Sequence, residues 1–450
     1  MTTAREARPS AVSRGAGTTQ DGDIRARWGW VEPAVWTERM LAALEQGVKG
    51  GVWFSLIDKV WTESNLRSSA LKVTANGGAP GVDHVTVEAF RDDGAANLAK
   101  LAAALRDGSY EPQAIRRTYI PKPGSSEQRP LGIPTVRDRV VQGAVRHAIE
   151  PIFEKEFATH SYGFRPGRGC KDALRRVDAL LKQGYVYVVD ADLKSYFDTI
   201  PHDRLMGRLR ERIADGRLLG LIESFLKAGI MDGLAEWEPE AGVPQGAVLS
   251  PLLSNVYLNP LDQQMAAKGF EMVRYADDFV ILCRNQAEAE AALTIVRQWC
   301  EAEGLLLHPN KTKIVDVRTG GFDFLGYHFQ TTRRGKLVHW PRKKSLDKLR
   351  STIRAKTKRT DGRSLRCIIA DINRTLQGWF GYFKHSYHTT FSYLDSWVRM
   401  RLRSLLRRRM HRRGRGRGTD HQRWPNSYFA EQGYSSLSAA HAAACQSPRG

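Results

Sequence analysis

The chain has 450 residues and an ordinary hydrophobic content, enough for two or three domains with a large core. Its 69 lysines and arginines outnumber 48 acidic residues and give a formal charge of +21, so we expect a polyanionic partner such as nucleic acid. Five cysteines without a CxxC pair argue against a zinc ribbon or knuckle, and no apolar run approaches the length of a membrane span. Reduced thiols and the absence of a membrane segment predict a cytoplasmic protein without a membrane partner.

The N-terminal stretch is rich in Ala, Arg, Gly, Ser and Thr and lacks the apolar core of a signal peptide. We expect residues 1–34 to form a disordered tail. Apolar residues then recur at helical spacing over about 35–70, 85–105 and 136–157. Between the last two stretches, 119–124 and 129–134 predict a strand, a tight turn and a second strand. Residues 35–185 are thus expected to form the first folded region.

Residues 186–340 show a mixed pattern that predicts an α/β region. A strand at 186–193 precedes a helix after Pro201, a Val-Pro-Gln-Gly loop and a helix from Ser250. Two short strands follow at 273–275 and 279–283. A helix over 287–303 and strands around Ile314 and at 322–329 complete the region.

The composition changes after about residue 341, where two amphipathic helices predict a third, helical region over 341–418. Between Arg401 and Gly418 the sequence holds nine arginines and no acidic residue. Residues 419–450 are expected to form a short basic tail that cannot hold a complete endonuclease domain.

Three aspartates give the strongest chemical signal. Asp277 and Asp278 are adjacent at the bend between two predicted strands, and Asp192 lies in a strand far upstream. Adjacent carboxylates repel each other and gain nothing from burial without a cation, so the set predicts a divalent-metal site. Two metal ions about 3.5–4 Å apart are the usual device for in-line phosphoryl transfer, which indicates a polymerase palm. Asp190 is an alternative to Asp192, because alternate strand residues point to the same face.

The motifs around these aspartates resemble those of the group II intron-encoded reverse transcriptase/maturase family. The segments 192–198 (DLKSYFD) and 275–278 (YADD) resemble motifs A and C, and 242–252 (GVPQGAVLSPL) resembles motif B. The segment 322–327 (FDFLGY) is similar to the start of the primer grip, and 376–383 (LQGWFGYF) is similar to the maturase, or X, domain. The resemblance implies an α/β right-hand polymerase fold: an N-terminal extension and fingers (35–185), a palm (186–340) and an α-helical thumb (341–418).

The resemblance also implies the metal ligands. It selects Asp192 over Asp190 and adds Asp277, Asp278 and the backbone carbonyl of Leu193. Together they would hold two Mg²⁺ ions, which Mn²⁺ can replace.

Four side chains are candidates for binding or discriminating the nucleotide. Lys122 and Arg129 flank a tight turn, from which two cations can grip a triphosphate. Gln245 precedes a glycine that allows close backbone approach, and the resemblance places it beside the incoming nucleotide or template base. The resemblance implies that Tyr196 packs against the sugar and excludes a ribose 2′-hydroxyl, whereas Phe197 belongs to the core.

Basic residues after position 310 are candidates for proton transfer and for RNA binding. Lys311 can protonate the leaving pyrophosphate as a general acid, and Lys313 competes for that role. The arginine run follows several aromatic residues, a combination that suits RNA. We assign to RNA Arg401, Arg403, Arg407, Arg408, Arg412 and Arg413.

The sequence therefore predicts an RNA-directed DNA polymerase of the bacterial, endonuclease-lacking type. It would copy intron RNA into cDNA during retrohoming and bind the same RNA as a splicing maturase. The expected partners are group II intron RNA, an RNA template with a DNA primer, target DNA in the nucleoid, and deoxynucleoside triphosphates. The alternative is a domesticated reverse transcriptase in host defence or DNA repair.

Overall fold

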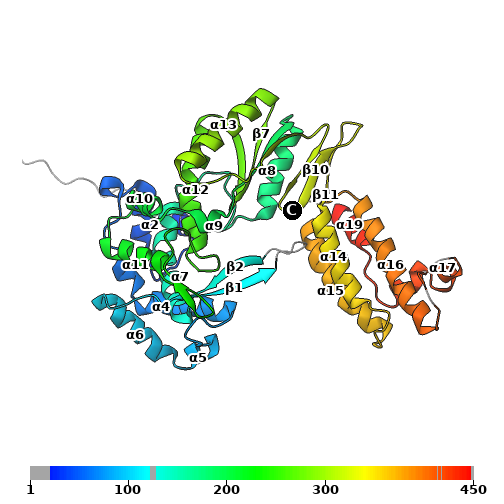
Figure 1. Cartoon of the computed structure of the whole chain (residues 1–450), viewed down its shortest axis with the longest axis horizontal. Helices are drawn as coiled ribbons and strands as arrows, with labels where there is room; N and C mark the ends of the chain where they lie inside the picture. Colours follow the sequence, from blue (N-terminus) through cyan, green and yellow to red (C-terminus); the bar gives the residue numbers. More distant parts are fainter. Residues whose placement is uncertain (1–20, 122–127, 413, 417, 447–450) are drawn as a thin grey trace, which may run out of the picture.

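The computed structural model describes residues 21–121, 128–412, 414–416 and 418–446. They form a mainly helical N-terminal part, a central α/β part and a helical C-terminal part, which follow each other along the chain (Figure 1). The predicted mixed α/β fold with fingers, palm and a helical thumb is confirmed. No helix in these described ranges is both long and apolar enough to span a membrane.

The fingers are built around α7 (Val136–Glu154), a helix that is buried on most of its surface. Thr135 caps it by accepting a hydrogen bond from the backbone N–H of Asp138. Gly143 lets a neighbouring helix approach closely, because a Cβ there would overlap the side chain of Ser69. The other elements of this part are α1 (Asp21–Arg27), α2 (Glu38–Gln46), η1 (Lys49–Gly51), α3 (Ile57–Val60), α4 (Glu63–Asn76), α5 (Val87–Asp92), α6 (Gly94–Asp107), β1 (Ile115–Pro121), β2 (Gln128–Ile133) and α8 (Cys170–Lys182).

The folded chain starts earlier than predicted, so a disordered tail reaching residue 34 is wrong. Trp28 and Val31 are buried in the fingers core, and Trp28 Nε1 donates to Glu45 at 3.1 Å. Residues 1–20 lie outside the described part of the chain.

The palm sheet has the order β6-β7-β3-β8, and all its neighbouring strands are antiparallel. Its two faces follow from the period-two pattern of its strands. Val188 and Val280 pack in a cluster with α8, whereas Val189 and Phe279 belong to the large core shared with the fingers. The central elements are β3 (Tyr187–Asp192), α9 (Tyr196–Thr199), α10 (His202–Arg210), α11 (Gly216–Lys227), β4 (Ile230–Asp232), β5 (Ala235–Trp237), α12 (Ser250–Ala267), β6 (Glu271–Tyr275), β7 (Asp278–Cys283), α13 (Gln286–Ala302), β8 (Lys313–Asp316), β9 (Gly321–Phe324), β10 (Tyr327–Thr331) and β11 (Leu337–Pro341).

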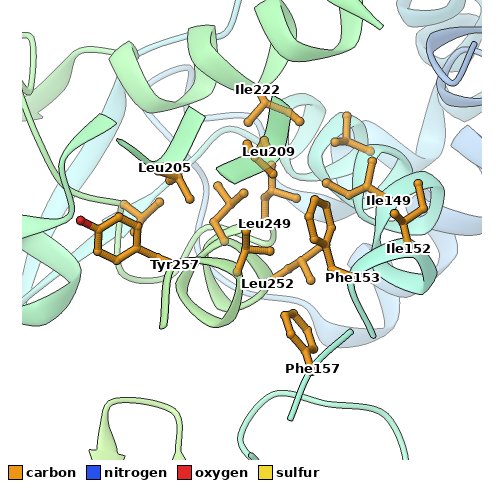
Figure 2. Packing of buried hydrophobic residues seen from close by; sticks show 14 of the residues in the cluster. Ile149, Ile152, Phe153, Phe157, Leu205, Leu209, Ile222, Leu249, Leu252 and Tyr257 are labelled. Carbon is orange, nitrogen blue, oxygen red and sulfur yellow. The ribbon is translucent and has the colours of Figure 1, made fainter. Parts of the chain in front are cut away.

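One continuous apolar core joins the fingers to the palm helices. Figure 2 shows Phe153 of α7 beside Leu249 and Leu252 at the start of α12, with Leu209 of α10 and Ile222 of α11 above them. Because these side chains are almost fully buried, the first turn of α12 is held against the fingers. The loop that precedes α12 therefore has a defined position relative to both parts.

Two further sheets connect the parts. The fingers sheet has the order β2-β1-β4-β5, so residues 230–237 leave the predicted palm and join the fingers. Strands β9, β10 and β11 form a separate sheet between palm and thumb, whereas β8, the strand around Ile314, pairs with β3 (Figure 1). Tyr327 of β10 donates its hydroxyl to the carbonyl oxygen of Tyr382 at 2.8 Å, which ties this sheet to the thumb.

The thumb extends beyond the predicted boundary at residue 418. Asp395 is fully buried and accepts hydrogen bonds from Tyr434, Ser436 and the first residues of the last helix. Residues 419–446 are therefore part of the helical core, and the expectation of a mere basic tail is wrong. The thumb helices are α14 (Lys343–Lys356), α15 (Leu365–Phe383), α16 (Thr389–Arg409), α17 (Thr419–Arg423), α18 (Asn426–Glu431) and α19 (Leu437–Gln446).

Candidate active site

The predicted aspartates meet at one end of the palm sheet. Asp192 ends β3 and lies directly opposite Asp278, the first residue of β7, in the antiparallel register. Asp277 precedes Asp278 in the turn between β6 and β7, where Ala276 has a left-handed φ of 59°. Asp190 lies two residues before Asp192 and therefore on the same face of the sheet. The topology thus gathers carboxylates that are far apart in the sequence.

Burial makes these carboxylates hard to ionise together. Burial, followed by repulsion from Asp190, Asp277 and Asp192, raises the pKa of Asp278 to about 7. Burial is also the main reason that the pKa of Asp190 rises to about 6 and that the pKa of Asp277 is raised. The guanidinium of Arg129 on β2 opposes the shift at Asp277. A bound cation would offset the same repulsion.

The donor set fits a hard divalent ion, although the side chains do not form a closed cage. Within the described ranges, no three His, Cys, Asp or Glu side chains are arranged as a metal-binding group. The ammonium of Lys311 instead lies 2.8 Å from Oδ2 of Asp192. Magnesium is usually held by one or two carboxylates together with substrate phosphates, so the oxygen donors suit it without a preformed cage. Leu193 is the predicted carbonyl ligand, and both of its neighbours are bonded to the loop after α13. The carbonyl of Asp192 accepts a hydrogen bond from the N–H of His308, and the N–H of Lys194 donates to the carbonyl of Leu306.

The two candidate lysines face different aspartates. Lys311 contacts Asp192, as described above, and its side chain is 61% exposed, which leaves it free to change partners. Lys313 begins β8, and its ammonium lies 3.8 Å from Oδ2 of Asp190. Only Lys311 therefore contacts one of the predicted metal ligands.

The two aromatic residues of motif A differ in burial. Tyr196 is 2% exposed, and its hydroxyl donates to the carbonyl oxygen of Ser254 at 2.7 Å. Its prediction as the sugar-contacting residue is wrong, because the ring has almost no exposed surface. Phe197 is half-buried, and its carbonyl accepts from the N–H of Val243 at 2.7 Å, next to the Val-Pro-Gln-Gly loop. Ser195 has a left-handed φ of 51°, which starts α9 so that Tyr196 points inward.

The loop that carries Gln245 is bonded to the fingers hairpin. The carbonyl of Gln245 accepts a hydrogen bond from the N–H of Gly132 on β2 at 2.7 Å. Gly246 has a φ of 110°, and a Cβ there would lie 2.6 Å from the carbonyl oxygen of Gly132. Arg129 lies on the same hairpin, whereas Lys122 is outside the described residues. The hairpin and the loop therefore form one unit beside the aspartates.

A cleft of about 560 Å³ opens between palm and thumb beside Asp278. Arg342, Lys348 and Trp379 are among its lining residues, and Arg342 opposes the pKa rise of Asp278. The motifs in the sequence do not single out Arg342 or Lys348 as site residues. The basic cluster Arg342-Lys343-Lys344, which follows the predicted primer-grip segment 322–327, is the pattern in the sequence that could have indicated them.

Part of the arginine run stabilises the thumb. Arg403 is 3% exposed and donates to the carbonyl oxygen of Trp424 and to Asn426, each at 2.9 Å. It cannot reach RNA from this position, so its assignment to RNA is wrong. Arg407 pairs with the buried Asp420 at 2.7 Å, and this pair holds α17 against α16.

The remaining arginines of the set differ in exposure. Arg401 is half-buried and donates to the carbonyl oxygen of Thr357 at 2.9 Å. Arg408 and Arg412 are exposed, and Arg413 lies outside the described residues. An acid-free run in the sequence therefore contains both structural and surface arginines.

Two family models match the chain. The model described as reverse transcriptase (RNA-dependent DNA polymerase) matches residues 120–329, which include the four carboxylates. The model described as group II intron, maturase-specific domain matches residues 346–424, which form most of the thumb. The fold and the aspartate site are thus those of a reverse transcriptase, an RNA-directed DNA polymerase that uses divalent metal ions.

Similar proteins define the family more closely. Protein YkfC of Escherichia coli (strain K12) is 36% identical over 67% of this chain and 85% of its own length. The group II intron-encoded protein LtrA of Lactococcus lactis subsp. cremoris is 41% identical over 40% of this chain and 29% of LtrA. A chain of a solved partial Cas6-RT-Cas1–Cas2 complex has 26% identity and a TM-score of 0.34, over 55% of this chain and 41% of that one. The chain belongs to the group II intron-encoded reverse transcriptase/maturase family.

The raised pKa of Asp278 predicts that the metal-free protein becomes less stable as pH rises. With a folded pKa of about 7, Asp278 keeps a proton that the unfolded chain releases above about pH 4. The destabilisation is therefore absent below pH 4, grows between about pH 4 and 7, and stays constant above. Asp278→Asn should raise the thermal midpoint at pH 8 in EDTA, and Mg²⁺ or Mn²⁺ should stabilise the wild type more than this variant.

The exposed Asp92→Asn, which removes the same charge from the fingers surface, is the control for this experiment. It should leave both the midpoint and the metal effect unchanged. Equal midpoints for wild type and Asp278→Asn at pH 8 in EDTA would contradict the prediction.

The burial of Tyr196 leaves Phe197 as the candidate residue for sugar selection. We expect Phe197 to exclude a ribose 2′-hydroxyl, so Phe197→Ala should increase incorporation of ribonucleotides relative to deoxyribonucleotides by about tenfold or more. One unfavourable interaction of about 1.4 kcal/mol corresponds to tenfold. Tyr196→Phe should leave the ratio unchanged, since it removes only a buried hydroxyl. The ratio is measured by single-nucleotide extension. An unchanged ratio in Phe197→Ala would assign both aromatics to the core.

Proposed function

We propose that the chain extends a DNA primer on an RNA template by two-metal phosphoryl transfer. The observation that carries this proposal is the cross-strand pair of Asp192 and Asp278 with Asp277 beside it in the turn. Together with the Leu193 carbonyl, these carboxylates would hold two Mg²⁺ ions, which Mn²⁺ can replace. When bound, the metals neutralise charge on the attacking and leaving oxygens.

Other residues would orient the nucleotide and move a proton. Arg129 lies on β2 of the fingers, and its charge opposes the pKa rise of Asp277, so it would bind the triphosphate, as would Lys122. Gln245 would lie beside the nucleotide or template base, and Phe197 beside the sugar. Lys311 would leave Asp192 and donate its proton to the departing pyrophosphate.

The direct test is the substitution Asp277→Asn. It removes one carboxylate charge without changing side-chain size, so primer extension on an RNA template with Mg²⁺ or Mn²⁺ should fall by at least about 10³-fold, roughly 4 kcal/mol of barrier. RNA binding should remain. Asp92→Asn serves as the matched control and should extend normally. Near-normal primer extension by Asp277→Asn would contradict the proposed chemistry.

We further propose that the thumb binds group II intron RNA as a maturase and that the polymerase copies this RNA at a DNA target during retrohoming, in the cytoplasm and nucleoid. A basic and aromatic ladder on α14 and α16 supports RNA binding. The guanidinium carbon of Arg350 lies 5.3 Å from the ring centre of Tyr393, and that of Arg354 lies 5.7 Å from the ring centre of Trp397. Tyr393 is 58% exposed, so the ladder presents both charge and a stacking surface.

The ladder is separate from the polymerase cleft. Lys348 and Thr352 of α14 line the cleft beside Asp278, whereas Arg350 and Arg354 project toward α16. Side chains two residues apart on an α-helix point in nearly opposite directions. One face of α14 is therefore available to the primer and template, and the other to a second stretch of nucleic acid.

Neutralising the ladder should weaken RNA binding but not primer extension on a short template. Arg350→Gln with Arg354→Gln should lower the slope of log affinity against log salt by about 0.7–0.9 for each phosphate that the protein no longer neutralises. The control is Arg297→Gln with Arg374→Gln, which removes two exposed arginines elsewhere. Filter binding of intron RNA at several salt concentrations gives both slopes. The same slope in both double variants would exclude the ladder as an RNA site.

A further inference from the structure

A fully buried arginine lies directly beneath the turn that carries Asp277 and Asp278. Arg274 is the fourth residue of β6 and has no exposed surface. Its backbone is held on the outer edge of the palm sheet, where its N–H donates to the carbonyl of His160 and its carbonyl accepts from Tyr162. A buried cation is costly unless it is paired and hydrogen-bonded, so its partners indicate its role.

All three nitrogens of the guanidinium are anchored on α12. Nε donates to both carboxylate oxygens of Asp262, at 2.8 and 3.0 Å, and a terminal nitrogen donates to Oδ2 at 2.5 Å. The other terminal nitrogen donates to Oδ1 of Asn255 at 2.9 Å. Asp262 and Asn255 lie two turns apart on the same face of α12. The planar guanidinium is therefore held in one orientation.

The remaining hydrogen bond reaches the turn itself. The nitrogen that contacts Asn255 also donates to the carbonyl oxygen of Ala276 at 2.9 Å. This oxygen belongs to the planar peptide that joins Ala276 to Asp277, so fixing it fixes the direction in which the chain enters Asp277. Ala276 has a left-handed φ of 59°, which an alanine adopts only when its surroundings hold it there.

Gly163 packs closely against the same turn. A Cβ at Gly163 would overlap the backbone nitrogen of Ala276, so the two backbones are in direct contact. The amide of Asn255 donates to the carbonyl oxygen of Gly163 at 2.8 Å. Asn255 therefore links the segment around Gly163 to Arg274.

We infer that Arg274 is a positioning residue for catalysis, which holds the Ala276–Asp277 peptide and thereby places the Asp277 carboxylate. This inference rests on the proposed polymerase function. The positioning role differs from a purely structural one. The bonds to Asp262 and Asn255 stabilise the fold, whereas the bond to the Ala276 carbonyl fixes the conformation of the turn.

Arg274→Lys tests the inference, since lysine can keep an ion pair with Asp262 but lacks the second arm for Ala276. We expect kcat for primer extension to fall about 100-fold, as for a misplacement of about 1 Å. The KM for deoxynucleoside triphosphate and the Kd for primer–template should stay within about threefold of the wild type. Arg139→Lys is the matched control, because Arg139 is also buried and donates to backbone carbonyls at 2.7 and 3.3 Å, but in the fingers. It should keep kcat.

The double variant Arg274→Met with Asp262→Leu separates stability from positioning. Removing both charges leaves no unpaired buried charge, so the thermal midpoint should return toward the wild-type value. The Ala276 carbonyl still lacks its donor, and kcat should remain about 100-fold low. Wild-type kcat in either Arg274 variant, or a loss confined to KM or Kd, would overturn the inference. If the wild-type protein did not extend the primer at all, the proposed polymerase function would be contradicted instead.

Discussion

Repulsion among carboxylates that share one partly buried end of the palm sheet is the constraint on which the rest of the structure depends. Burial and three neighbouring carboxylates raise the pKa of Asp278 to about 7, so the site is under strain until positive charge arrives. Each of the three parts of the molecule contributes a positively charged side chain. Arg129 comes from the fingers, Arg342 from the edge of the thumb and Lys311 from the loop after α13. The folding of the three parts and the electrostatics of the site are therefore coupled.

The same constraint explains why the turn between β6 and β7 is held so firmly. Adjacent carboxylates would tend to separate, and the left-handed Ala276 adds conformational strain. Arg274 meets both needs with one side chain, because its guanidinium is bonded to the turn and its charge faces Asp277. The cost of burying this cation is offset by the fork on Asp262. Stability and geometry at the site thus depend on one buried network.

Arginine has two distinct uses in the thumb, which the sequence does not separate. Arg403 and Arg407 bind groups of the thumb itself and hold the C-terminal helices against α16. Arg350 and Arg354 instead lie over the aromatic rings of α16; Arg354 is exposed, whereas Arg350 is half-buried and also pairs with Asp347 at 3.5 Å. Both uses exploit the planar guanidinium, which can fork onto oxygen acceptors or stack on a ring. A dense run of arginines in the sequence therefore does not by itself locate an RNA-binding surface.

The sequence by itself determined the fold class, the order of the parts and the three aspartates, because strand periodicity, adjacent acids at a bend and the family motifs are local signals. It could not decide which of the neighbours Tyr196 and Phe197 faces the site, since that depends on the left-handed Ser195 and on the carbonyl of Ser254. It also missed the Arg274 network, because Asp262 and Asn255 come together with that arginine only when α12 packs on β6. Patterns along a chain report which elements form, whereas side-chain partners are decided by long-range packing.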